Sequence, residues 1–273
     1  MKPISLIPCL ALGGLLASRI LVPADANGAD TGGVEHIKEC SRENIPEPGA
    51  VRAIRFVSRD RLGSKRVTRL RLEGKRAADG SRRMLAVVVE PVEMEGAMLL
   101  LIERDGNNEI YFKSPDLPEP KLISMSDQSL SMFGTDFSYE DIQNLQRFNR
   151  PGVSKRLPDS QVSGRPVWVV ETLPEAGSGS AYSSIVTSID KQTCIALKIE
   201  MFGDNHRVRK VLNVDPNQIV KRGPTWIAHH AILKDMRDYT ETQMLVDSAD
   251  VHVQFPEDHF QVGSLRPASA PAP

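Results

Sequence analysis

The stretch that decides the fold runs from Arg83 to Glu103 and contains two apolar segments, Leu85-Ala86-Val87-Val88-Val89 and Met98-Leu99-Leu100-Leu101-Ile102. The two segments are joined through Pro91 and Gly96. Within each segment neighbouring positions are all apolar, so both faces of each strand are predicted to be covered. The stretch therefore predicts two buried strands in a β-sheet.

Further strand patterns lie on both sides of this stretch. In Val67–Glu73, apolar or hydroxyl side chains alternate with charged ones, which is a period of two with one wet face. A turn at 60–64 separates that segment from Val51–Ser58. The other predicted strands cover 109–113, 167–173, 182–189, 194–202, 208–214, 225–233 and 242–246.

Two helices are predicted among the strands. Val34–Arg42 carries apolar side chains at a spacing of three residues, which favours a short helix. Ser138–Leu145 begins with a serine N-cap followed three residues later by Asp141, an approximate capping box. A loop is expected around 151–152. The whole pattern predicts a mainly β protein, an antiparallel sheet curled around an apolar interior.

The N-terminus has the features of a secretory signal. Lys2 is followed by an apolar run and then by the small-residue site Ala24-Asp25-Ala26. An uncleaved anchor helix is the alternative, but a span needs about 20 apolar residues, and Arg19 and Pro23 interrupt this run. We therefore expect a signal peptide over 1–26 cleaved near Ala26, one domain over 27–264, a disordered tail over 265–273, and a periplasmic location.

Charge is balanced overall but unevenly placed. The full chain has a net charge of −1, which does not favour a nucleic-acid partner. The segment from Arg52 to Arg83, however, holds twelve lysines and arginines against three acidic residues, a net charge of +9. It is interpreted either as the solvated face of a strand pair or as a patch for anionic lipid headgroups or an acidic partner.

Two cysteines, Cys40 and Cys194, remain once the predicted signal and its Cys9 are removed. Exported proteins meet oxidising conditions, in which an even pair of cysteines usually forms a disulfide. We therefore predict a Cys40–Cys194 disulfide, with two buried free thiols as the alternative.

Motifs for catalysis or cofactor binding are not apparent. The chain has neither a Gly-x-Ser-x-Gly elbow nor a Walker loop. His229 and His230 fall within a strand pattern, so their side chains are expected on opposite faces. We predict no catalytic residue, no metal and no cofactor. A hydrolase with an unrecognised site remains an alternative.

The most specific motif is Met132-Phe133-Gly134-Thr135-Asp136-Phe137-Ser138-Tyr139-Glu140-Asp141-Ile142. It resembles the Gly-[Ser/Thr]-Asp-Phe-[Ser/Thr]-Tyr-x-Asp motif of LolA-like outer-membrane lipoprotein-sorting proteins. Ser188-Ile189-Asp190-Lys191-Gln192-Thr193 resembles the hairpin of that family, and Phe255-Pro256-Glu257-Asp258-His259-Phe260 resembles its closing element. The similarity spans most of residues 34–262.

The resemblance implies a half-open antiparallel β-barrel with a few helices covering its mouth. It implies a carrier or chaperone that holds the acyl chains of lipid or lipoprotein cargo in an apolar cleft, with an inner-membrane transporter or outer-membrane acceptor as possible partner. The alternative is an envelope-stress sensor of the RseB type, which binds lipid or lipoprotein and a membrane regulator. Cleft or lid candidates are Phe137, Tyr139, Ile142, Met98 and Leu100; the family-motif loop contributes Gly134, Asp136, Ser138 and Asp141. Met84, Met94 and Met201 are further candidates for an adaptable lining.

Overall fold

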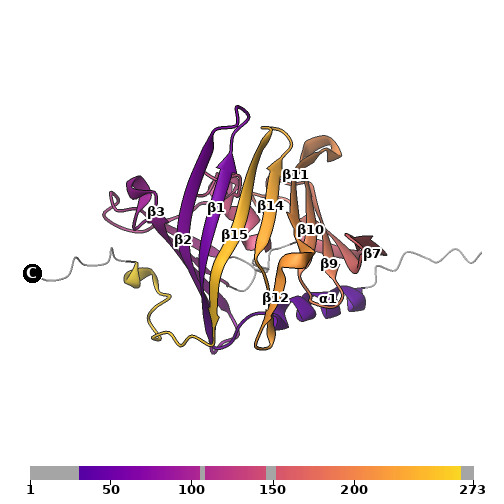
Figure 1. The fold of residues 1–273 in the computed structure, drawn as a ribbon, viewed down its shortest axis with the longest axis horizontal. Coiled ribbons are helices and arrows are strands. Elements are labelled where there is room, and N and C mark those ends of the chain that lie inside the picture. The colour runs from indigo at the N-terminus through magenta and orange to yellow at the C-terminus, as the bar shows by residue number, and fades with distance from the viewer. Residues whose placement is uncertain (1–30, 105–107, 146–151, 266–273) are drawn as a thin grey trace, which may run out of the picture.

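A computed structural model describes residues 31–104, 108–145 and 152–265. Thirteen strands form one antiparallel sheet in the order β6-β5-β4-β3-β2-β1-β15-β14-β11-β10-β9-β8-β7 (Figure 1). The strands of this sheet are β1 (Gly49–Arg59), β2 (Lys65–Arg76), β3 (Arg82–Glu90), β4 (Met98–Ile102), β5 (Glu109–Lys113), β6 (Lys121–Leu122), β7 (Gly152–Val162), β8 (Arg165–Pro174), β9 (Ser184–Asp190), β10 (Ala196–Phe202), β11 (Val208–Val214), β14 (His230–Asp235) and β15 (Thr240–Val251).

The smaller elements precede, connect or follow these strands. A separate hairpin consists of β12 (Ile219–Arg222) and β13 (Thr225–Ala228), and the two α-helices are α1 (Thr31–Glu43) and α2 (Tyr139–Leu145). Short 3-10 helices occur at η1 (Val92–Met94), η2 (Met125–Ser129), η3 (Asp204–His206), η4 (Pro216–Gln218) and η5 (Val262–Ser264).

The sheet curls without closing. Among the described strands, β6 and β7 are the two ends of the strand order and do not pair with each other. At the centre, β1 pairs with β15 along its length, which joins the N-terminal and C-terminal halves. The predicted half-open antiparallel β-barrel is confirmed.

The interior face of the sheet is built from cross-strand apolar pairs. Alternation places every second side chain of each strand on this face. Ile54 lies opposite Leu70, and Leu212 lies opposite Leu233. All four side chains are buried in one large core cluster. This cluster lines the concave side of the curled sheet.

The other face of β3 and β4 is covered by the C-terminal segment. Phe260 and Leu265 are buried there against Leu85, Leu100 and the neighbouring apolar side chains. This explains why both strands are apolar at consecutive positions. Leu265 was expected to begin a disordered tail, but it packs into this cluster; residues 266–273 lie outside the described residues.

Several predicted elements match, and others differ. Strand β11 has the predicted bounds, and both predicted helices form, α1 with three additional residues before Val34 and one after Arg42. Strand β7 was not predicted: a loop was expected around 151–152, and the largely polar sequence that follows has no buried face. The predicted strand 225–233 is divided at His229, whose ring hydrogen-bonds the Val246 carbonyl. His229 and His230 therefore do not continue one strand.

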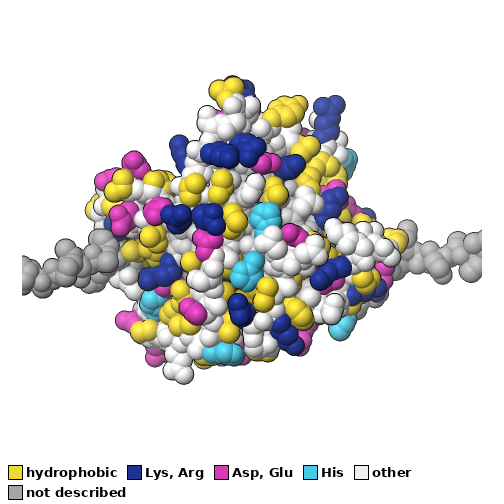
Figure 2. Space-filling view, viewed as in Figure 1, with side chains coloured by type: hydrophobic (Ala, Val, Ile, Leu, Met, Phe, Trp, Pro, Cys, Tyr) yellow, Lys and Arg dark blue, Asp and Glu magenta, His cyan; other side chains and the backbone are white. Residues whose placement is uncertain are grey.

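The basic run between Arg52 and Arg83 is largely neutralised by pairing. Seven of its twelve cations lie within 4.0 Å of a carboxylate: Arg55, Arg59, Arg69, Arg71, Arg76, Arg82 and Arg83. Figure 2 shows basic and acidic side chains interspersed over the face that it presents. This pairing favours the interpretation of the run as a solvated strand face.

The predicted signal peptide, residues 1–26, lies outside the described residues. Within the described part of the chain, no helix is long and apolar enough to cross a membrane.

Candidate functional site

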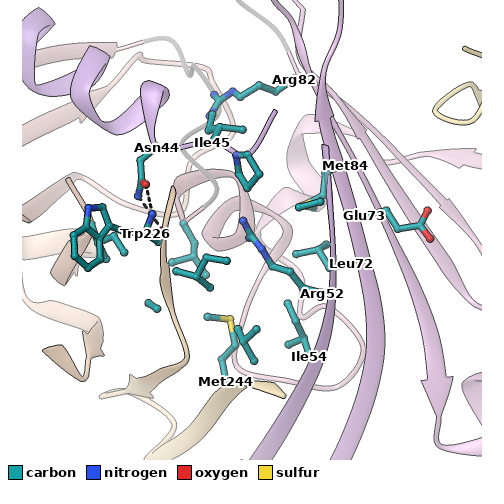
Figure 3. A pocket seen from close by; sticks show the side chains of 18 of the residues that line it. Asn44, Ile45, Arg52, Ile54, Leu72, Glu73, Arg82, Met84, Trp226 and Met244 are labelled. Atoms are coloured by element: carbon teal, nitrogen blue, oxygen red, sulfur yellow. Dashed lines mark hydrogen bonds between the residues drawn. The ribbon is translucent and has the colours of Figure 1, made fainter. Parts of the chain in front are cut away.

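A pocket opens at one end of the concave face, where the end of α1 approaches the sheet (Figure 3). Its walls are largely apolar. Leu72 and Met84 line it from β2 and β3, Met244 lines it from β15, and Trp226 lines it from β13. The cavity volume is about 150 Å³. A cavity of that size holds a group comparable to benzene, so a longer acyl chain requires the mouth to widen.

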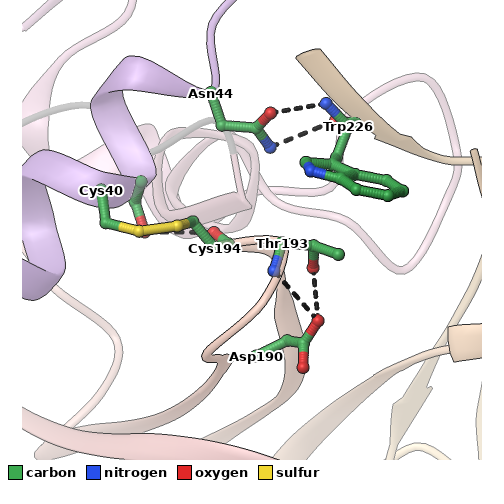
Figure 4. Close-up of a disulfide and its surroundings, with 7 residues drawn as sticks. Cys40, Asn44, Asp190, Thr193, Cys194 and Trp226 are labelled. Carbon is green, nitrogen blue, oxygen red and sulfur yellow. Dashed lines mark hydrogen bonds between the residues drawn. A yellow bond between two sulfur atoms is a disulfide. The ribbon is translucent and has the colours of Figure 1, made fainter. Parts of the chain in front are cut away.

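A disulfide and two sets of hydrogen bonds fix the end of α1 against the sheet, and we call them the α1 anchor (Figure 4). The first is the predicted disulfide between Cys40 and Cys194, whose Cα atoms are 5.7 Å apart. The second is the hydroxyl of Ser41, which donates to the Cys194 carbonyl at 3.2 Å. In the third, the Asn44 amide accepts from the Trp226 backbone N–H at 2.6 Å and donates to its carbonyl at 3.1 Å.

The turn that presents Cys194 is held by local chemistry. The Asp190 carboxylate accepts hydrogen bonds from the Thr193 hydroxyl at 2.6 Å and from its backbone N–H at 3.2 Å (Figure 4). Such side-chain caps are the reason that Asp and Thr favour turns. Because Ile195 and Ala196 follow directly and line the pocket, the α1 anchor and the pocket wall share one turn.

Glu73, Lys75, Arg82 and Arg83 also line the pocket, and each of them has a partner within the described residues. Arg52 is the charged lining residue whose contacts differ from theirs. It lies on β1 at an interior-facing position, two residues before the buried Ile54 and opposite Leu72. Its Nε atom is buried and has no hydrogen-bond partner among the described residues. Burial lowers the pKa of Arg52 below its ordinary value. The sequence offered one signal for this residue, an arginine on the apolar side of the β1 alternation.

The motif residue Asp141 anchors α2 rather than facing the pocket. Its carboxylate accepts from Lys210 Nζ at 2.8 Å, from the Tyr182 hydroxyl at 2.6 Å and from the Ser138 backbone N–H at 2.8 Å. The Ser138 hydroxyl accepts from the Asp141 N–H at 3.1 Å, which completes the predicted capping box. Burial, and then the charge of Asp141, raise the pKa of Tyr182.

Asp136 and Gly134 fix the loop that leads into α2. The Asp136 carboxylate accepts hydrogen bonds from the hydroxyls of Thr240 and Thr242 on β15, and its carbonyl accepts from Lys210 at 2.5 Å. Gly134 has a φ of +69°, and a Cβ atom there would lie 2.6 Å from Nη1 of Arg66. The four motif residues Gly134, Asp136, Ser138 and Asp141 are thus brought together as a lock between α2 and the sheet.

The aromatic and aliphatic motif residues belong to the core. Phe137 is 1% exposed, and its ring centroid lies 5.3 Å from that of Phe56. Tyr139 and Ile142 are buried in the same cluster. None of the three lines the pocket, whereas Leu145 at the end of α2 does. Their packing makes them supports for the helix.

The structure places the two strand candidates away from the pocket. Met98 and Leu100 pack with Phe260 on the opposite face of β4, and their position as cleft residues is corrected accordingly. The physical reason is that successive side chains of a strand point to opposite faces of the sheet, so Leu99 and Leu101 face the interior and their neighbours do not. Of the three candidate methionines Met84, Met94 and Met201, Met84 lines the pocket.

Metal-binding geometry is absent from the described residues, in which no group of three His, Cys, Asp or Glu side chains could hold an ion. The buried Lys210, Asp141 and Tyr182 group is saturated by its own hydrogen bonds. The pocket can hold an apolar group beside the guanidinium of Arg52, and Lys75, Arg82 and Arg83 also lie on its wall.

Comparison with known proteins gives a family and a fold. A family model described as an uncharacterized protein matches residues 80–267. No curated protein sequence matches the chain. An outer membrane lipoprotein-sorting protein domain from Vibrio parahaemolyticus is similar in structure, with a TM-score of 0.77, 19% sequence identity, and coverage of 86% of this chain and 98% of that one.

Two further solved structures are similar. A DUF1329 family protein from Desulfovibrio piger has a TM-score of 0.78 and 18% identity, covering 87% of this chain and 99% of that chain. A LolA superfamily protein from Nitrosomonas europaea has a TM-score of 0.64 and 13% identity, covering 83% and 96%. At these identities the similarity establishes the fold, which is LolA-like.

Proposed function

Because this chain belongs to the uncharacterized protein family whose model matches residues 80–267 and its fold is LolA-like, we propose that it is a periplasmic carrier. In this proposal it binds acyl chains of lipid or lipoprotein cargo for transport or sorting toward the outer membrane. The observation that carries the proposal is the apolar pocket at the mouth of the half-open sheet.

The chemistry of the pocket is suited to binding without turnover. Each CH₂ group moved from water into an apolar site gains about 0.8 kcal/mol, so a cleft of Leu, Ile and Met side chains can hold an acyl chain without a catalytic group. Met84 and Met244 add flexible side chains that adapt to different cargo shapes. Because ATP is absent outside the cytoplasm, cargo in this proposal passes from a protein that binds it weakly to one that binds it more tightly.

Access to the pocket is controlled by the α1 anchor in this proposal. The described cavity is too small for a long acyl chain, and the end of α1 with Asn44 and Ile45 forms part of its rim. Displacement of this rim, with the Cys40–Cys194 link as tether, widens the mouth for loading. The helix α2, whose Leu145 lines the pocket, stays in place because Asp141 pairs with Lys210.

The test is extraction of lipid from the exported protein, followed by mass spectrometry and by binding of an added lipopeptide. We expect bound acyl species in the wild type and their loss in Ala228→Phe, which fills the pocket from β13. Val220→Phe on the neighbouring strand β12 is the matched control, because Val220 is exposed and does not line the pocket.

Two outcomes would count against the carrier role. A wild-type protein that is free of lipid and ignores added lipid and lipopeptide would overturn it. Capture of an inner-membrane regulator without any acyl cargo would favour the stress-sensor alternative instead.

A further inference from the structure

Arg52 occupies an unusual environment for a cation. Its side chain reaches from β1 into the middle of the pocket, between the rim that follows α1 and the wall formed by Leu72 and Ile54 (Figure 3). No described residue forms an ion pair or hydrogen bond with its Nε. Arg52 is half-buried, and an Nε–H group that is buried without an acceptor is unfavourable, so an acceptor from outside the chain would satisfy it.

The neighbouring carboxylates are already engaged. Glu73 points to the far side of its strand in Figure 3, where it pairs with Arg71 at 2.7 Å and with His259 at 2.5 Å. Glu103 pairs with Arg82 at 3.0 Å. Seven of the ten arginines of the basic run lie beside a carboxylate, and Arg61 and Arg66 are exposed to solvent. Arg52 differs from both groups, because it has no carboxylate partner among the described residues and it lines the pocket.

The surroundings of Arg52 define the ligand that would suit it. Leu72, Met84, Met244 and Trp226 give the pocket an apolar wall. In a low-dielectric site an ion pair is stronger than in water, and a guanidinium presents several donors in a plane that match the oxygens of a carboxylate or phosphate. A molecule with hydrocarbon next to an anionic oxygen group therefore satisfies both parts of the site.

We propose that the pocket selects acidic amphiphiles, with Arg52 binding the anionic oxygen group while the hydrocarbon lies against the apolar wall. This inference rests on the proposed carrier function and narrows its cargo class. The anionic group is a carboxylate, as in a free fatty acid, or a phosphate, as in a lysophospholipid. Arg52 is a specificity-determining residue in this scheme.

The experiment compares anionic and neutral ligands of equal chain length on the exported protein, below their micelle concentrations, by isothermal titration calorimetry. Palmitate is compared with hexadecanol, and lysophosphatidate with monoacylglycerol. A charge-assisted hydrogen bond is worth about 1.5–3 kcal/mol, so the wild type should favour the anionic ligand by about tenfold or more. The larger ratio of the two pairs identifies the headgroup.

Arg52→Met should bring each ratio to about one while neutral binding is retained, because the hydrocarbon contacts remain. Arg61→Met is the matched control, since Arg61 is an exposed arginine in the β1–β2 turn and its removal changes net charge equally. Arg52→Lys keeps the charge and should retain part of the preference, even if Arg52→Met fails to fold.

The outcomes are separable. Equal binding of palmitate and hexadecanol by the wild type overturns the role of Arg52 and leaves the carrier function standing. Failure of all four ligands to bind overturns this inference, and failure of the added lipopeptide as well overturns the carrier function. A folded Arg52→Met variant that loses neutral and anionic ligands alike would show that Arg52 supports the pocket structure, which also overturns the inference.

Discussion

Removal of the disulfide is the most direct test of the α1 anchor. Cys40 and Cys194 are separated by 154 residues, so their link closes a loop that includes most of the sheet. In the chain-entropy treatment, a crosslink over a loop of this length stabilises the native state by about 5 kcal/mol, because it restricts the unfolded chain. Typical domains are stable by about 5–15 kcal/mol in total, so this is a large share.

The measurement is guanidinium unfolding of the exported wild type and the double variant Cys40→Ser with Cys194→Ser, followed by circular dichroism. We expect the free energy of unfolding to fall by several kcal/mol, with an increased denaturant dependence because the uncrosslinked unfolded chain is more expanded. The native spectrum should be unchanged, since Asn44 still bonds both backbone groups of Trp226.

A single-site control separates the crosslink from its neighbouring hydrogen bond. Ser41→Ala keeps the disulfide and removes only the hydroxyl that donates to Cys194, which should cost about 1 kcal/mol. If the double variant loses no more than Ser41→Ala, the reasoning about the crosslinked unfolded chain is refuted. Two free thiols in the exported wild type would refute the pairing itself.

Four further changes test other parts of the structure. Lys210→Met leaves Asp141 as a buried charge without its cation and should destabilise the protein by about 3–5 kcal/mol in urea unfolding, whereas an effect below 1 kcal/mol would contradict the lock. Gly134→Ala forces a side chain into a left-handed conformation and should cost about 1–2 kcal/mol by thermal melting; unchanged stability would contradict the turn geometry. Phe260→Ala should cost about 3–5 kcal/mol in the same assay, unless the C-terminal segment is dispensable to the core. The pKa of Tyr182 is raised in the folded state, so its contribution to the free energy of unfolding is full below about pH 10 and is lost as the pH rises above that value. In pH-dependent unfolding, Tyr182→Phe should therefore lose less stability above about pH 10 than the wild type, and an equal loss in both proteins would contradict this.

Much of the fold follows from local pattern. The apolar spacing in α1, the Ser138 and Asp141 cap of α2 and the strand β11 were all predicted, because each depends on side chains that are close in sequence. The cysteine pairing followed from export and the count of two. Strand β7 escaped prediction, since its polar residues occupy an edge strand whose side chains are mostly not buried.

The site was harder to predict because it depends on which face is interior. Met98 and Leu99 are both apolar, and only the placement of the C-terminal segment decides that Leu99 faces the main core. Likewise Arg52 looked like one member of a basic run. Its role appears only when the β1 register sets it opposite Leu72. Motif residues such as Asp141 proved to be supports, because a LolA-like motif can preserve how α2 is held as readily as what is bound.

The pairing of β1 with β15 has a consequence for biogenesis. Ala50 lies opposite Val251, so the middle of the sheet joins positions about two hundred residues apart. Contacts of such sequence separation form slowly, because the chain must close a long loop before the strands meet. The two halves of the sheet cannot be united until the last strand has been synthesised. If the chain is exported, as we propose, it can therefore cross a membrane before the two halves of its sheet have paired.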